Sequence, residues 1–434
     1  MIERSLPAFV LAACLIAASV LPVLAQPKPP PWQGVYEGTI GKAHVVVALT
    51  PDAARYFYVG KTNDLGLIVS AEGDHLSIVE TLAPTIEADD VKDQPDLVSG
   101  AWSVTFANGA IKGVWKDAHG ERERPIALSR VSSDDESADS FFQQNAPGAY
   151  GERWLRTAPA LVVDRAEKTI GPLSYRSMRD PQFGSAVPRL VKAPKPVNID
   201  AVNATLDRLQ RYFRLQDRDC LQGVREMHAR AGAERLAQAD KENADTTSDS
   251  PTELKPIFAT DRLLTLERTE MVFCGGAHPN LVDEDYVFDL SDGAQLTERD
   301  DSDQAGKTGD TGDLASSGLG RALDLADPKE RAKFDALWMA SIRAGIAARH
   351  ADDEPECGDV IKEMLDQSDR DQPVSINAYP IAAGLAIRVT GFPHAIAICE
   401  NGQSFNPTII PYAALKPFLK PRQTLLPAGS PSPK

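Results

Sequence analysis

Apolar residues alternate with polar ones along much of the first third of the chain. Val45, Val47 and Leu49 fall on one side of an extended segment, and the stretch 102–106 repeats the same two-residue period. This period is typical of a β-strand that buries one face. The pattern predicts about eight strands between Trp32 and Val131, namely Tyr36–Ile40, Ala43–Leu49, Arg55–Val59, Leu65–Val69, Leu76–Thr81, Trp102–Phe106, Ala110–Trp115 and Pro125–Leu128.

Turn residues separate these strands. Gly41-Lys42 and Asn108-Gly109 stand where a two-residue hairpin loop needs positive φ angles, and Asn-Gly is a strong hairpin signal. Strands that follow one another so closely form an antiparallel meander, which closes into a small barrel or folds into a sandwich. A barrel of this size can be filled by its own side chains, which we favour, or can hold one small apolar ligand.

The second half of the chain adds helical spacing to the strand pattern. We expect mainly short strands between Tyr150 and Pro196. A helix that begins at Asn198 or Asp200 and continues with interruptions to about Leu236 would turn one apolar face toward a sheet. That face carries Val202, Leu206, Leu209 and Phe213.

A further helix signal lies at Asp327-Pro328, where a capping aspartate precedes a proline at the first helical position. This helix is predicted to end near His350. Apolar runs and alternation predict strands at Leu263–Leu266, Met271–Cys274, Tyr286–Leu290, Val374–Asn377, Leu385–Val389 and Ile396–Cys399. The fold class is therefore α+β, with helices packed on an antiparallel sheet after the all-β domain.

Polar segments divide the chain into regions. The length of 434 residues is enough for two or three domains with apolar cores. A polar run follows the last predicted strand of the all-β domain and reads as a linker. We assign a leader to 1–25, the all-β domain to 32–131, the linker to 132–147, the α+β domain to 148–421 with its core at 198–421, and a flexible tail to 422–434.

The net charge of −16 restricts the classes of partner. Nucleic-acid recognition requires a basic face, so we expect no nucleic-acid partner. An acidic protein is likewise repelled by an anionic membrane surface and attracts cationic partners. The charge therefore favours a cationic protein partner, and we expect no cofactor.

The first 25 residues have the pattern of a secretory signal. Glu3-Arg4 precedes an apolar run, and Val23-Leu24-Ala25 provides small residues for cleavage near Ala25. The alternative is lipoprotein processing at Cys14, although the apolar run continues well past that residue. No later stretch approaches the roughly 18–20 apolar residues that span a bilayer. We expect a periplasmic or secreted protein without a membrane span in its mature form.

Four cysteines remain after this leader. An even number in an exported protein indicates two disulfides, for which three connectivities exist. The order along the chain favours Cys220–Cys274 and Cys357–Cys399. No two of these cysteines have the close spacing of zinc ligands, so we predict no metal site.

The most distinctive motif is Cys-Gly-Gly-Ala-His-Pro-Asn at 274–280. Gly275 and Gly276 permit backbone angles that other residues avoid, and Pro279 restrains His278 to an extended backbone. The motif resembles the signature turn of the RsiV-like extracytoplasmic domain, which occurs in lysozyme-sensing anti-sigma factors and beside the catalytic domain of some peptidoglycan deacetylases. The closing run Ile410–Leu419 is similar to the end of the same domain.

This resemblance implies a sensory or accessory domain that binds a partner in the cell envelope, such as a lysozyme-like muramidase or a peptidoglycan fragment. The binding residues would be Gly275, Gly276, His278 and Asn280. The catalytic residues of the deacetylases have no counterpart here, so the resemblance does not imply their activity.

The same turn also suggests a catalytic alternative. His278 could act as a general base if Asp283 or Asp285 oriented its ring, although a ring that only fixes the turn is the simpler interpretation. The other histidines lack metal-binding spacing, and no Gly-x-Ser-x-Gly or phosphate-binding loop is present. We therefore favour a non-catalytic envelope protein over a periplasmic hydrolase or a carrier of small apolar ligands.

Overall fold

The computed structural model describes residues 29–51, 54–61, 63–133, 148–242, 252–275, 280–297, 319, 322–349, 375–390, 408–421 and 425–427. The chain divides into two compact units, Met1–Pro31 and Trp32–Lys434. The second unit combines an eight-stranded antiparallel barrel with further sheets and helices, so the α+β class is confirmed. The leader, most of the linker and most of the tail lie outside the described residues.

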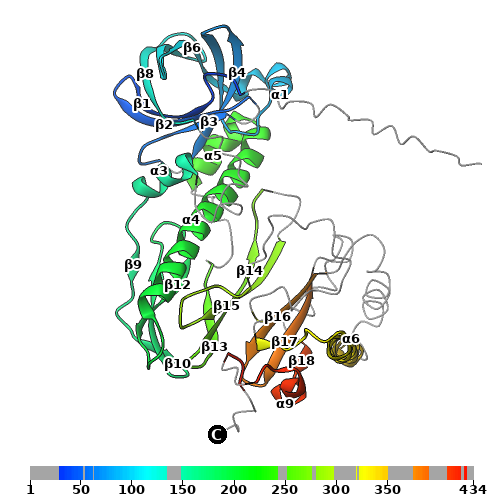
Figure 1. Cartoon of the computed structure of the whole chain (residues 1–434). Helices are drawn as coiled ribbons and strands as arrows, with labels where there is room; N and C mark the ends of the chain where they lie inside the picture. Colours follow the sequence, from blue (N-terminus) through cyan, green and yellow to red (C-terminus); the bar gives the residue numbers. More distant parts are fainter. Residues whose placement is uncertain are drawn as a thin grey trace, which may run out of the picture. The chain divides into compact units, whose positions relative to one another are not determined.

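The first eight strands form a closed barrel (Figure 1), which decides between the two predicted arrangements. Each strand pairs with the next along the chain, and the last strand pairs with the first. Asn108 and Gly109 have φ angles of 50° and 75°, as the predicted hairpin loop requires. The strands are β1 (Gly34–Ile40), β2 (Ala43–Leu49), β3 (Ala54–Tyr58), β4 (Asp64–Glu72), β5 (His75–Thr81), β6 (Val98–Ala107), β7 (Ala110–Asp117) and β8 (Glu123–Ser132).

Alternate residues of these strands build the core of the barrel. Tyr36, Val47 and Tyr56 are fully buried there, together with Trp102 and Ile111. Between β5 and β6 the chain forms α1 (Ala88–Asp93) and a short 3₁₀ helix, η1 (Pro95–Leu97). The buried side chains of the strands lie inside the barrel, and whether they leave room for a small apolar ligand stays a prediction.

The region after the barrel begins with a helix. The expectation of short strands is wrong for α3 (Ala149–Thr157). Tyr150 and Trp154 are four residues apart and are both buried. Helical spacing puts them on one face of α3. Phe57 packs against Tyr150 there, with 5.2 Å between the ring centroids. Short strands then follow as β9 (Val162–Val163), β10 (Lys168–Ile170), β11 (Leu173–Arg179) and β12 (Ala186–Lys192).

The longest helix, α4 (Ile199–Arg230), begins where the sequence predicted. The Asn198 side chain accepts a hydrogen bond from the Ala201 backbone N–H at 3.2 Å and caps the helix. The predicted apolar face is buried against β12 and against a sheet of β13 (Lys255–Ala259), β14 (Leu263–Val272) and β15 (Asn280–Asp289). The helix ends before Gly232, which has a φ of 110°, and α5 (Ala233–Glu242) follows.

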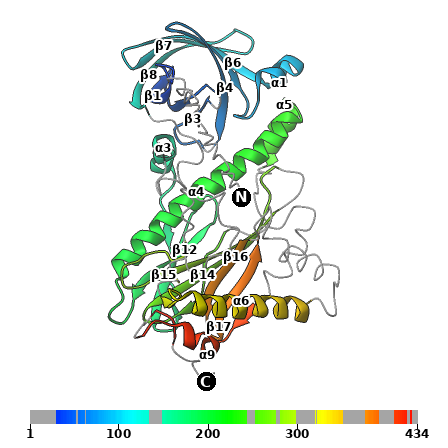
Figure 2. The ribbon, with the colours of Figure 1, turned by 45° about the vertical axis from the view of Figure 1, so that its right-hand side comes forward.

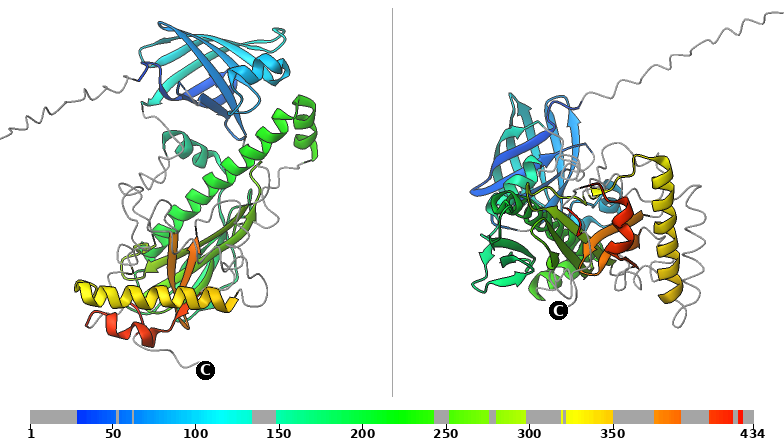
Figure 3. Two further views of the ribbon diagram at one scale, coloured as in Figure 1. Left: turned by 90° about the vertical axis from the view of Figure 1, so that its right-hand side faces the viewer. Right: turned by 60° about the horizontal axis from the view of Figure 1, so that its bottom comes forward.

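The C-terminal part packs a helix beside a third sheet. α6 (Pro328–Arg349) begins at the predicted cap, where Asp327 accepts a hydrogen bond from the Lys329 N–H at 2.9 Å. The sheet consists of β16 (Ser375–Ile381), β17 (Gly384–Thr390) and β18 (Thr408–Ile410), followed by α9 (Tyr412–Leu415) and η4 (Lys416–Phe418). Figures 2 and 3 show α6 running beside these strands, and the two share one apolar core.

No helix in the described ranges is both long and apolar enough to cross a membrane.

A buried ion pair connects α4 with the barrel. Arg218 on α4 is 3% exposed and pairs with Asp64 at the start of β4, which is 1% exposed. The guanidinium carbon of Arg218 also lies 5.1–5.5 Å from the ring centroids of Phe57, Tyr150 and Trp154. A cation enclosed in this way needs its carboxylate, because the buried charge has lost its water.

We expect Arg218→Ala to lower the free energy of unfolding by about 3 kcal/mol, because it removes the buried partner of Asp64 and leaves this carboxylate with only the partly exposed Arg55, 3.7 Å away. Arg211→Ala is the matched control on the same helix, since Arg211 pairs with Glu152 while 44% of its side chain is exposed. The control should cost less than about 1 kcal/mol. Urea unfolding of both variants measures the difference, and equal losses would contradict the assignment.

Candidate functional site

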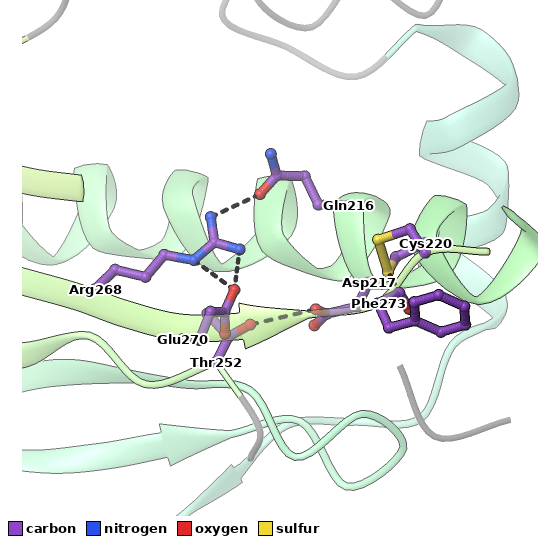
Figure 4. Close-up of a disulfide and its surroundings, with 8 residues drawn as sticks. Gln216, Asp217, Cys220, Thr252, Arg268, Glu270 and Phe273 are labelled. Atoms are coloured by element: carbon purple, nitrogen blue, oxygen red, sulfur yellow. Dashed lines mark hydrogen bonds and ion pairs between the residues drawn. A yellow bond between two sulfur atoms is a disulfide. The ribbon is translucent and has the colours of Figure 1, made fainter. Parts of the chain in front are cut away.

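The predicted turn begins at a disulfide. Cys274, just after β14, is bonded to Cys220 on α4 (Figure 4), with 4.4 Å between the two Cα atoms. This is one of the two pairings that the sequence favoured. Cys357 and Cys399 lie outside the described residues, so their pairing stays a prediction.

The turn also touches the helix through backbone. A Cβ on Gly275 would overlap the carbonyl oxygen of Gly223 on α4, and a Cβ on Gly223 would overlap the carbonyl oxygen of Cys274. Gly275 in addition has a φ of 83°, which disfavours other residues. Helix and turn can therefore approach this closely only because both positions are glycine.

The structure places some of the predicted site residues. Gly275 and Asn280 flank the turn, whereas Gly276 and His278 lie outside the described residues. Asp283 and Asp285 are on β15, opposite Thr269 and Glu267 of β14. The proposed contact of His278 with either aspartate therefore stays a prediction.

A cluster of charged groups lies beside the disulfide on the α4 side of the sheet. The Arg268 Nε donates to Glu270 Oε1 at 2.9 Å, and its Nη1 donates to Glu284 Oε2 and to Gln216 Oε1, each at 3.0 Å. The Arg268 guanidinium also lies 4.7 Å from the ring centroid of Phe213. Arg268 and Glu270 are 4% and 5% exposed, so this ion pair is part of the protein interior.

Sequence reasoning missed this cluster. It treated Leu263–Leu266 and Met271–Cys274 as separate runs, whereas β14 is continuous from 263 to 272. Alternation along one strand puts Arg268 and Glu270 on the same face as Leu264 and Leu266. Extending the two-residue period through the polar residues would have found them.

Asp217 on α4 is the most perturbed acid of the cluster. Thr252 Oγ1 donates to Asp217 Oδ1 at 3.4 Å (Figure 4). The pKa of Asp217 is raised to about 7, mainly by burial and also by the charges of Glu270 and Asp180. A hydrogen bond with Ser185 and the charge of Arg268 act in the opposite direction. This carboxyl group can therefore gain or lose a proton near neutral pH.

The barrel contains a second buried carboxylate, that of Glu80 on β5. Its Oε2 accepts hydrogen bonds from Tyr56 Oη at 2.8 Å, Trp102 Nε1 at 2.9 Å and Trp115 Nε1 at 2.8 Å, and its Oε1 accepts one from Ser99 Oγ at 2.8 Å. Burial and the Glu80 charge together hold the pKa of Tyr56 far above its usual range, so its hydroxyl remains a donor. Glu80 thus fixes two indole rings and one phenol within the core.

Within the described ranges, no group of three or more His, Cys, Asp or Glu side chains is arranged to hold a metal ion. The two sites can therefore be described as buried hydrogen-bond and ion-pair networks, one beside the disulfide and one in the barrel.

No protein-family model matches this chain. The comparison with curated proteins gives no match either.

We expect Gly275→Ala to destabilise the chain much more than Gly60→Ala. The φ angles are 83° and 84°, but a Cβ on Gly60 meets nothing within 4 Å. Gly60→Ala should cost about 1–2 kcal/mol for its left-handed backbone alone, and overlap with Gly223 should add about 1–3 kcal/mol at Gly275. Urea unfolding measures both, and equal costs would show that helix and turn are not in contact.

Glu80→Gln should lower the free energy of unfolding by about 1–3 kcal/mol. The Glu80 carboxylate accepts four hydrogen bonds, and the amide NH₂ group of glutamine cannot accept any of them. Glu123→Gln on β8 is the control, since 60% of the Glu123 side chain is exposed, and it should change stability by less than about 0.5 kcal/mol. Tryptophan fluorescence during urea unfolding reports on the barrel. If both variants unfold at the same urea concentration, Glu80 does not organise the core.

Proposed function

We propose that this chain is a non-catalytic binding or accessory protein of the cell envelope, with an RsiV-like domain after its barrel. The partner would be a cationic envelope protein such as a lysozyme-like muramidase, or a peptidoglycan fragment. The turn at 274–280 would form part of the contact surface. The observation that carries this proposal is the attachment of that turn to α4 by the Cys220–Cys274 disulfide and the Gly223–Gly275 contact.

The disulfide supports an exported location. Disulfides persist in oxidising compartments and are rare in the cytosol, and the first 25 residues have the pattern of a secretory signal. We therefore propose that the mature chain is periplasmic or secreted. Processing at Cys14 to give a lipoprotein is the alternative.

The arrangement beside the turn supports binding more than catalysis. The charge of Arg268 is already compensated by Glu270 and Glu284 and is buried, which favours a structural role for this arginine. A turn that is fixed at its start loses little conformational entropy when a partner binds. The hydrolase alternative requires His278 with Asp283 or Asp285 and would predict turnover that depends on the histidine ring.

The net charge supports a cationic partner. A charge of −16 accelerates the encounter with a basic protein and makes binding sensitive to salt. The alternative of a small apolar ligand in the barrel has less support, because fully buried side chains such as Tyr36, Tyr56 and Ile111 occupy the described core.

We expect the mature chain to bind a c-type lysozyme and to release no product from peptidoglycan. His278→Ala and Asn280→Ala should weaken binding at least about tenfold, the effect of losing one central contact. His119→Ala is the control, since His119 lies in an exposed turn of the barrel, and it should bind like the unmodified chain. Calorimetric titration measures the affinity.

Cytochrome c serves as a second basic protein in these titrations. Equal affinity for cytochrome c would show that charge alone drives binding. Peptidoglycan turnover that His278→Ala abolishes would instead favour the hydrolase alternative.

A further inference from the structure

The charged cluster beside the disulfide contains more acids than bases. Its members come from α4, from β14 and β15, and from the loop between β11 and β12. Four carboxylates and two guanidinium groups meet here: Asp180, Asp217, Glu270 and Glu284 with Arg214 and Arg268. The Glu284 side chain is 41% exposed, but the other three carboxylates still outnumber the two guanidinium groups. Enclosing this excess of negative charge is unfavourable unless something neutralises it.

The two cations are already engaged. Arg214 pairs with Asp180, and Arg268 pairs with both Glu270 and Glu284. Within the part of the chain that the structure describes, Asp217 forms no ion pair and interacts only with neutral hydroxyl groups and by longer-range charge. Asp217 is therefore the acid whose charge is least compensated.

Three carboxylate oxygens of the cluster have no hydrogen-bond donor, and one of them, Asp180 Oδ2, lies against Arg214 in an ion pair. Asp217 Oδ2 and Glu270 Oε2 are both buried and unpartnered, and the Glu270 side chain is only 3% exposed. A buried polar atom without a partner costs about 1–3 kcal/mol, and more when it is charged. Native proteins resolve such atoms with water, an ion or a proton.

A proton fits these observations better than a metal ion. No group of three or more His, Cys, Asp or Glu side chains in the described ranges is arranged so that it could hold a metal ion, whereas a proton requires no additional volume. A proton on Asp217 would turn its oxygen into a donor and remove one negative charge beside Glu270. We propose that Asp217 carries a proton below neutral pH, and that the joint between α4 and β14 loosens when this proton leaves.

The location of Asp217 gives the proton a structural effect. Asp217 precedes Cys220 by three residues, which is less than one helical turn. On α4 its charged neighbour is Arg214; β14 contributes Arg268 and Glu270, and β15 contributes Glu284. The remaining polar groups that face it are Asp180 and Ser185 of the β11–β12 loop and Thr252 before β13.

The direction of the pH effect follows from the raised pKa. The folded chain binds the proton more tightly than the unfolded chain does, so the stabilisation is fully present below the ordinary carboxyl pKa of 3.8 and is lost progressively until the pH passes about 7. In alkali, Asp217 and Glu270 would repel each other across the joint, and the turn would depend more on the disulfide.

The experiment measures how fast a water-soluble phosphine reduces the Cys220–Cys274 disulfide in the full chain, with peptide mapping to identify the bond. The reference is Asp217→Asn, measured at the same pH to cancel the pH dependence of the phosphine. We compare the reduction rate of the unmodified chain with that of the variant at each pH. Between about pH 5.5 and pH 8.5 this ratio should rise about tenfold, because the equilibrium constant for separation of α4 from β14 should rise about tenfold.

Asp207→Asn is the matched control, because Asp207 is a half-exposed acid on the same helix that pairs with Arg189. It should keep the profile of the unmodified chain. An unmodified chain that shows no acceleration relative to Asp217→Asn would overturn the proposal. Slower reduction at alkaline pH on addition of Ca²⁺ or Mg²⁺ alone would assign the site to a metal ion and overturn it as well.

A second measurement covers the case in which Asp217→Asn does not fold. Infrared spectra of the unmodified chain should show a protonated carboxyl band that disappears as pH rises through neutrality. The Glu270→Gln variant should lose the band at lower pH, because the Glu270 charge is one of the causes that raise the pKa of Asp217. Absence of any band that titrates in this range overturns the proposal.

Discussion

The ion pair between Arg218 and Asp64 is the interaction on which the described arrangement of helix and barrel depends. A guanidinium group that is 3% exposed has lost its water and must be compensated by a carboxylate. The surrounding rings of Phe57, Tyr150 and Trp154 exclude solvent and also attract the cation. The charge of Arg218 is therefore compensated and shielded from water only when α4 packs against both the barrel and α3.

The same part of this helix also holds the turn at Cys274, by different means. Cys220 and Gly223 attach the turn at Cys274 covalently and through close backbone contact. Gln216 and Asp217 face the charged end of β14, where Arg268 pairs with Glu270. Helix α4 thus contacts an apolar core, a polar cluster and a disulfide. A partner that binds the turn would contact a part of the protein that cannot move independently of this helix.

The sequence predicted those parts of the fold that follow from local pattern. Two-residue alternation and the Asn108-Gly109 loop indicated the strands, and the caps at Asn198 and Asp327 indicated where helices begin. The missed helix α3 has a physical explanation. Its two large residues, Tyr150 and Trp154, become an apolar face only because the barrel offers Phe57 as a packing surface.

The sequence by itself determined the strand pattern, the class of fold and the motif at 274–280, because these depend on residue types at short spacing. Only the tertiary structure decided which charges are buried and which groups compensate them. Asp217 and Arg268 are 51 positions apart in the chain, and nothing local to either indicates the other. Asp217 and Arg268 come together only because α4 packs on β14. This packing removes water from both side chains, so the protonation of Asp217 depends on the charges that surround it.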